Sequence, residues 1–153
     1  MQAHLLDDFL TERECNILIE HYTERKDFVK KYHTNLCLDL DPNDLKIKFL
    51  KDKLNYWANY YYQSEIDWFQ IVQWPTGAFQ PVHLDTTSPL TTCSSITYLN
   101  DDFLGGNTFF NEGTIFKPKK RRTLFFDGMH FRHGVTTVQK GIRFVVASWY
   151  KKL

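Results

Sequence analysis

Two residues with metal-binding side chains, His83 and Asp85, are separated by a single leucine. Side chains on an extended strand alternate between its two faces, so His83 and Asp85 are expected to point to the same side. One imidazole nitrogen and one carboxylate oxygen can then reach a common ion. A second histidine from elsewhere would complete a set of two histidines and one carboxylate. Such a set occupies one face of a non-haem Fe(II) ion and leaves the opposite positions open.

Two later histidines, His130 and His133, are candidates for the third ligand. Beyond them Arg143 stands between Ile142 and Phe144 in an apolar stretch. An inward-facing arginine among apolar neighbours is costly unless an anion pairs with it. A forked contact with a carboxylate would satisfy the guanidinium, whereas pairing with an internal acid is the structural alternative.

The second half of the chain consists of short runs rich in β-branched and aromatic residues, separated by turn residues. Several strands at this spacing predict an antiparallel sandwich or jelly roll. The predicted strands are Ile66–Trp74, Phe79–Leu84, Thr91–Leu99, Asn107–Asn111, Arg122–Phe126, His133–Val138 and Ile142–Tyr150.

Helix signals are confined to the first part of the chain. Thr11 and Glu14 have the spacing of a capping box. A second helix is predicted to begin at Asp41-Pro42 and to run to about Gln63, with apolar residues every three or four positions. Both helices are expected to support the outer face of the β structure. The segment 28–40 between them has no clear period and is interpreted as either a strand or a loop.

Composition narrows the class of protein. The chain has 153 residues and a formal charge of +1, and its three cysteines lack the spacing of a disulfide framework or a zinc site. Without a signal peptide or a long apolar run, we expect a cytoplasmic protein that does not enter membranes. The one basic cluster, Lys117–Arg122, is interpreted as a solvated hairpin tip, so a nucleic-acid partner is not expected.

Taken together, the chain resembles the 2-oxoglutarate- and Fe(II)-dependent dioxygenases of the prolyl 4-hydroxylase group. The family pattern of H-x-D, a distal histidine and a basic residue about ten positions later matches His83-Leu84-Asp85, His133 and Arg143. Supporting stretches in the family's order are Asp8–Cys15, Thr97–Asn100, Gly105–Phe109, Lys117–Lys120, Leu124–Phe126 and Trp149-Tyr150.

The resemblance implies a mainly β double-stranded β-helix (jelly roll) with N-terminal supporting helices, formed by residues 1–153 as one dioxygenase domain. It implies that His83, Asp85 and His133 bind Fe(II) and that Arg143 binds 2-oxoglutarate. O2 is the other cosubstrate, and ascorbate is the expected reductant. Tyr98 matches a position that contacts the same carboxylate. Trp74 replaces a tyrosine of many relatives, so either its indole N–H substitutes for the tyrosine hydroxyl in contacting the cosubstrate or that contact is lost; Trp74 is interpreted as a cosubstrate-binding residue.

The expected activity is hydroxylation of peptidyl proline in a peptide or protein partner. Two alternatives stay open: the same chemistry on a free amino acid or other small molecule, and a non-catalytic metal- or ligand-binding β-helix module. The segments Phe28–Leu40 and Thr86–Pro89 lack a strong period. They are expected to cover the open end of the barrel and to become ordered over an extended peptide.

Overall fold

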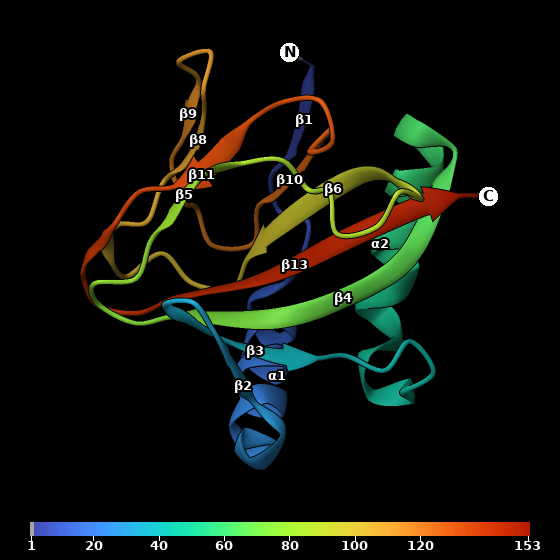
Figure 1. Ribbon diagram of the computed structural model, residues 1–153. Helices are drawn as coiled ribbons and strands as arrows, with labels where there is room; N and C mark the ends of the chain where they lie inside the picture. The colour runs from blue at the N-terminus through green and yellow to red at the C-terminus, as the bar shows by residue number, and fades with distance from the viewer. Residues whose placement is uncertain (1) are drawn as a thin grey trace.

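The computed structural model describes residues 2–153 (Figure 1). Its helices are α1 (Glu12–Glu24), η1 (Lys26–Phe28), η2 (Leu45–Ile47) and α2 (Lys48–Tyr62). Its strands are β1 (Ala3–Leu6), β2 (Lys30–Tyr32), β3 (Asn35–Asp39), β4 (Ser64–Trp74), β5 (Gln80–His83), β6 (Thr91–Tyr98), β7 (Leu104–Gly105), β8 (Thr108–Phe110), β9 (Ile115–Phe116), β10 (Thr123–Phe126), β11 (His133–Val135), β12 (Val138–Lys140) and β13 (Arg143–Lys152).

The strands form antiparallel sheets. A seven-stranded sheet has the order β1-β10-β6-β13-β4-β3-β2, and a four-stranded sheet has the order β5-β11-β8-β9. Strands β12 and β7 form a separate two-stranded pair. The small sheet lies over one part of the large one, and the helices lie on the opposite side (Figure 1). This architecture confirms the predicted mainly β double-stranded β-helix with N-terminal supporting helices.

Helix α1 begins where the sequence predicts. The hydroxyl of Thr11 accepts from the backbone N–H of Glu14 at 3.1 Å, and the Glu14 carboxylate accepts from the N–H of Thr11 at 2.8 Å. Glu14 also binds Lys53 of α2 at 2.7 Å, which ties the two helices together. The first turn is therefore satisfied by its own side chains.

Helix α2 begins later than predicted, at Lys48. The carboxylates of Asp41 and Asp44 accept from the N–H groups of Asn43 and Lys46, each at 2.9 Å. These local contacts stabilise a turn followed by a 3₁₀ segment, because an aspartate side chain that accepts from a nearby backbone N–H competes with the hydrogen bonds of an α-helix. The predicted end is close to the observed one, because Gln63 adopts a left-handed conformation (φ 52°) after Tyr62.

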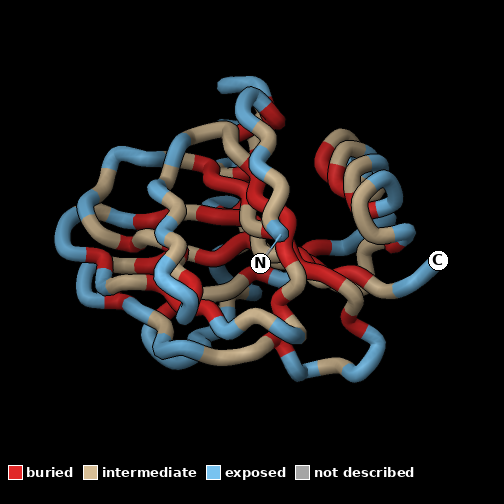
Figure 2. The backbone as a smooth tube through the Cα atoms, turned by 90° about the horizontal axis from the view of Figure 1, so that it is seen from above, coloured by how far each residue is buried: buried red, intermediate tan, exposed pale blue. Residues whose placement is uncertain are grey.

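The core lies between the helices and the outer face of the large sheet. Leu18 of α1, Leu50 and Leu54 of α2, and Phe69 and Val146 of the sheet are at most 1% exposed. Helix α2 turns its buried residues toward the strands (Figure 2). Because the helices cover one face of the large sheet, its other face is left to line a cavity.

None of the helices within residues 2–153 is long and apolar enough to cross a membrane.

Strand β1 was not predicted. It is four residues long and pairs with β10, whose register places Leu5 opposite Leu124. The basic run that precedes β10 holds this strand in place: Arg122 binds Asp7 at 2.6 Å, and Lys120 binds Glu12. The run is therefore paired with the N-terminal acidic residues rather than merely solvated.

The structure settles one segment that the sequence left open and divides one predicted strand. The open segment 28–40 forms the hairpin β2–β3, whose strand β3 joins the edge of β4. Predicted strand His133–Val138 divides into β11 and β12, which belong to different sheets. Between them, Thr136 donates its N–H to the carbonyl of Asn107 and Gly106 donates to that of Thr137, in line with the β11–β8 and β12–β7 pairs.

Candidate active site

The small sheet brings His83 and His133 together. His83 is the last residue of β5, His133 is the first residue of β11, and the two are directly paired in the antiparallel register. Their rings lie 4.4 Å apart between centroids. Asp85 follows the end of β5 and is held by its backbone N–H, which donates to the carbonyl of Gly128 at 2.8 Å. Strand pairing and one loop contact therefore assemble residues from two distant parts of the chain.

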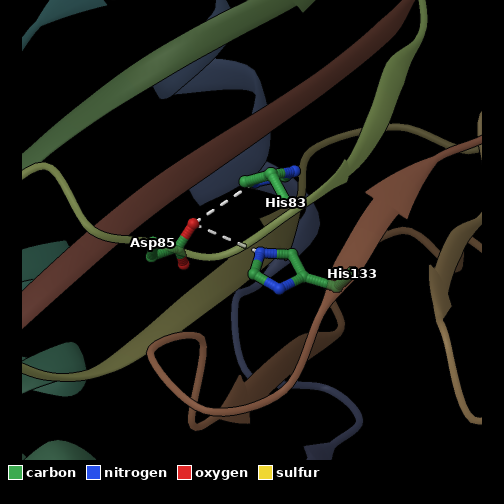
Figure 3. Close-up of side chains that lie close together, drawn as sticks. All are labelled: His83, Asp85 and His133. Carbon is green, nitrogen blue, oxygen red and sulfur yellow. Dashed lines mark ion pairs between the residues drawn. The ribbon is translucent and has the colours of Figure 1, made fainter.

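The three side chains present their ligand atoms to one point (Figure 3). Asp85 Oδ1 lies 3.3 Å from His83 Nε2 and 3.2 Å from His133 Nε2, and the three ligand atoms lie within 4.8 Å of one another. Each Nδ1 lies 2.9 Å from a carbonyl oxygen, that of Pro81 for His83 and that of Phe131 for His133. These carbonyls accept a hydrogen bond from Nδ1–H, so that Nε2 of each ring is the nitrogen that faces Asp85 and could bind a metal.

The site keeps a carboxylate charge in a buried position. Burial alone would raise the pKa of Asp85, but hydrogen bonds from His133, His83 and Ser94 hold this pKa well below its usual value. For His83, burial lowers the pKa, but the hydrogen bonds to Asp85 and to the Pro81 carbonyl raise it by more, so the net change is an increase. The Asp85 carboxylate can therefore stabilise a positive charge beside it, either of a proton or of a metal ion.

Arg143 lies at the deep end of the same cavity. It is 0% exposed, and among residues 2–153 it forms no ion pair with a carboxylate. One contact, from Nη2 to the Thr108 hydroxyl, is 3.3 Å long, and Nε has no hydrogen-bond partner. Tyr98 donates to or accepts from the same Thr108 hydroxyl at 2.7 Å. A buried guanidinium with free donors is the complement of an anion.

Trp74 stands beside this arginine. The guanidinium carbon of Arg143 lies 4.9 Å from the centre of the indole ring and 5.5 Å from that of the Tyr98 ring. Trp74 is 5% exposed, and its Nε1 has no hydrogen-bond partner within the described chain. The deep end therefore offers two unpaired N–H donors side by side.

One cavity of about 900 Å³ is lined by His83, Asp85, His133, Arg143, Thr108 and Trp74, and Tyr98 lies behind this wall against Arg143 and Thr108. Its wall runs from Arg143, Trp74 and Thr108 past the His83, Asp85 and His133 group to the stacked rings of Trp68 and Trp149, whose centroids are 3.7 Å apart. Apolar residues, among them Val72, Val135 and Val145, line the middle. A small acid fits at the deep end with room left for a larger molecule at the other.

The match to known families decides what this arrangement is. The family model described as "2OG-Fe(II) oxygenase superfamily" matches residues 55–151, which is more than half of the chain and contains all of the residues just described. The chain belongs to this superfamily. Fe(II) and 2-oxoglutarate are accordingly the metal and cosubstrate that the oxygenase requires, and a set of two imidazoles and one carboxylate fits Fe(II).

Solved structures agree with the fold of this oxygenase. The viral collagen prolyl hydroxylase of Paramecium Bursaria Chlorella virus-1 has a TM-score of 0.82 at 19% identity, over 100% of this chain and 97% of that chain. A Pseudomonas putida prolyl-4-hydroxylase has a TM-score of 0.80 at 17% identity, over 99% and 92%. A Trichoplax adhaerens prolyl hydroxylase, in complex with a hypoxia inducible factor peptide, has a TM-score of 0.79 at 14% identity, over 98% and 83%. No curated protein sequence matches significantly.

All of the candidate site residues named from the sequence, except His130, lie in one of two neighbouring groups. His83, Asp85 and His133 form one group, and Arg143, Tyr98 and Trp74 form the other. His130 lies outside both: its side chain is 80% exposed and binds Asp127 at 2.8 Å.

Sequence reasoning missed two residues that contact Asp85, namely Ser94 and Gly128. The sequence could have pointed to Ser94, because the alternation of side chains along β6 places it on the same face as Ile96 and the candidate site residue Tyr98. Gly128 had none, since only its position in the fold shows how closely it approaches Asp85.

Proposed function

We propose that this oxygenase hydroxylates peptidyl proline. His83, Asp85 and His133 would hold Fe(II), and Arg143, Tyr98 and Trp74 would bind 2-oxoglutarate. The observation that carries the proposal is one cavity in which the three ligand atoms lie between a buried arginine without an anionic partner and the stacked rings of Trp68 and Trp149. When bound, Fe(II) would activate O2 as the oxidant, with 2-oxoglutarate supplying two electrons: one oxygen atom would enter the substrate C–H bond and the other would leave in succinate, with release of CO2.

The protein's own contribution is binding and exclusion of water. The guanidinium of Arg143 would donate hydrogen bonds to the far carboxylate of 2-oxoglutarate, and the N–H of Trp74 and the hydroxyl of Tyr98 would donate beside it. The Nδ1 contacts to Pro81 and Phe131 would keep both imidazoles in the tautomer that binds metal through Nε2. The apolar middle of the cavity would keep the reacting C–H bond away from bulk water.

The substrate is inferred from the opening of the cavity. The hairpin β2–β3 lines the cavity along the edge of β4, where β3 pairs with residues 70–73, and its Thr34 hydroxyl both accepts from the N–H of Phe79, at 3.1 Å, and donates to its carbonyl, at 2.9 Å. An opening bounded by a hairpin and stacked Trp68 and Trp149 suits an extended chain better than a compact metabolite. The fold neighbours that act on prolyl residues support the same choice.

The test compares substrates. Purified protein with Fe(II), 2-oxoglutarate and ascorbate is incubated with proline-containing peptides or with free proline, and succinate is measured. We expect peptides to stimulate succinate formation and to gain the mass of one oxygen atom. Stimulation by free proline alone would replace the peptide substrate with a small molecule. Succinate formation that neither compound stimulates would keep the oxygenase and reject proline.

A further inference from the structure

The two oxygens of the Asp85 carboxylate have different surroundings. Oδ1 faces His83 and His133, at 3.3 and 3.2 Å from their Nε2 atoms. Oδ2 points the other way and accepts a hydrogen bond from the Ser94 hydroxyl at 2.6 Å. Asp85 and Ser94 are 8% and 3% exposed, so water does not compete strongly for either oxygen. The fold therefore distinguishes two atoms that are chemically equivalent in a free carboxylate.

Gly128 closes the space on the Oδ2 side. Its carbonyl accepts the N–H of Asp85 at 2.8 Å. A Cβ atom at this position would lie 2.2 Å from Asp85 Oδ2, 2.9 Å from Asp85 Cγ and 2.9 Å from Ser94 Oγ. No side chain larger than hydrogen fits there without moving the carboxylate. The backbone of Gly128 is not left-handed, so the requirement for glycine is one of space alone.

We propose that Ser94 and Gly128 are positioning residues that restrict Asp85 to one metal bond, through Oδ1. This inference rests on the proposed iron site. A carboxylate can bind a cation through one oxygen or through both. If Oδ2 also turned to the metal, it would occupy a position that the cosubstrate or O2 requires. The hydroxyl of Ser94 keeps Oδ2 occupied, and the absence of a side chain at Gly128 leaves room for this orientation.

Ser95 provides a matched control for Ser94. It is the next residue of β6, is 1% exposed, and its hydroxyl forms an equally short bond of 2.6 Å, to the Tyr150 hydroxyl. Removing either hydroxyl takes one buried hydrogen bond from the same strand. Only Ser94→Ala, however, frees an oxygen of Asp85, whereas Ser95→Ala leaves the carboxylate unchanged.

The experiment uses Mn(II), which does not react with O2 under assay conditions and accepts the same oxygen and nitrogen ligands. Wild-type protein, Ser94→Ala and Ser95→Ala are each loaded with Mn(II). Water-proton relaxation then reports the metal-bound waters, and calorimetry gives the affinity of the loaded protein for 2-oxoglutarate. A crystal structure of the Mn(II)-loaded wild type reports the two Mn–O distances of Asp85 directly.

We expect wild type and Ser95→Ala to bind Mn(II) through Oδ1 only and with the same number of waters. Ser94→Ala should still bind Mn(II) but with one water fewer, and its affinity for 2-oxoglutarate should fall by about tenfold or more. Ser94→Thr, which keeps a hydroxyl, should restore both properties. Gly128→Ala, which displaces the carboxylate itself, should weaken Mn(II) binding.

Two results would overturn the inference while leaving the iron site in place. One is Ser94→Ala matching Ser95→Ala in bound waters and in 2-oxoglutarate affinity. The other is a wild-type structure in which both oxygens of Asp85 bind Mn(II), and this result needs no variant that folds. If wild type does not bind Mn(II), or if His83→Ala binds it equally well, the proposed iron site fails instead.

Discussion

Arg143 and Trp74 are directly opposite each other on β13 and β4, and each has a buried N–H group without a partner. The guanidinium carbon lies 4.9 Å from the indole centre, a cation–π contact that stabilises the positive charge but does not neutralise it. Backbone pairing between two long strands thus places both donors at the closed end of the cavity. Their unpaired state is costly unless an anion binds there.

The first prediction concerns that arginine. Arg143→Ala should weaken 2-oxoglutarate binding by about 2–5 kcal/mol, or roughly thirty- to several-thousand-fold, because a buried charge-assisted contact is lost. Arg143→Lys should recover part of this loss, since an ammonium keeps the charge but not the fork. Calorimetry with Mn(II)-loaded protein measures the affinity, and Mn(II) binding itself should change little. An unchanged affinity in Arg143→Ala would remove the carboxylate-binding role.

The second prediction tests the indole N–H. Trp74→Phe keeps an aromatic ring beside Arg143 but removes the unpaired donor. A hydrogen bond to a charged group contributes about 1.5–3 kcal/mol, so the KM for 2-oxoglutarate should rise roughly ten- to hundredfold. Trp57→Phe, in α2 and away from the cavity, is the control for the smaller ring. Equal KM values for the two variants would show that Trp74 only fills space.

The third prediction separates the histidines. His83→Ala, Asp85→Ala and His133→Ala should each weaken Fe(II) or Mn(II) binding by more than about a hundredfold and abolish turnover, because one of three ligands is lost. His130→Ala should retain both properties, since its side chain is 80% exposed and is bound to Asp127. Anaerobic calorimetry gives the affinities. Inactive His130→Ala together with active His133→Ala would reverse the assignment.

The fourth prediction concerns the hairpin at the cavity mouth. Thr34→Val removes both hydrogen bonds to Phe79 but keeps the side-chain shape. Because these bonds hold the tip of β2–β3, amide hydrogen exchange across the segment 30–39 should become faster. Exchange in β13 should stay the same. Addition of a peptide substrate to the wild type should slow exchange in the hairpin. Equal exchange rates in Thr34→Val and wild type, and with and without peptide, would mean that the hairpin takes no part in substrate binding.

The fifth prediction is a pH dependence of stability. The hydrogen bond from Arg122 lowers the pKa of Asp7 below 3.8, its ordinary value. A lowered folded-state pKa stabilises the fold above the unfolded-state pKa, and the contribution disappears as the pH falls through the folded-state pKa. Asp7→Asn should therefore reduce the free energy of unfolding at pH 7, by about 1 kcal/mol or less because Asp7 is partly exposed.

Urea unfolding at pH 7 and below pH 3 checks this dependence. The difference between wild type and Asp7→Asn should shrink at the lower pH. Asp8→Asn is the control, since the Asp8 carboxylate is 75% exposed and lies 3.3 Å from Arg121. A difference that stays constant between the two pH values would contradict the ion-pair explanation.

Local patterns in the sequence determined much of the fold. The capping box at Thr11, the alternation in the predicted strands and the H-x-D spacing all act through neighbouring residues, so one sequence is enough to recognise them. The beginning of α2 was misjudged for the same kind of reason. The side chains of Asp41 and Asp44 accept from the backbone N–H two residues later, and these local contacts compete with the helix that Pro42 predicts.

Tertiary structure decided what depends on long-range pairing. Four residues of β1 form a strand only because β10 offers them an edge, and the basic run beside β10 is neutralised only because Asp7 and Glu12 reach it. The register of β5 and β11 selected His133 over His130 as the neighbour of His83. Whether Arg143 meets an internal acid, and how Ser94 and Gly128 enclose Asp85, depended on distances that spacing along the chain does not contain.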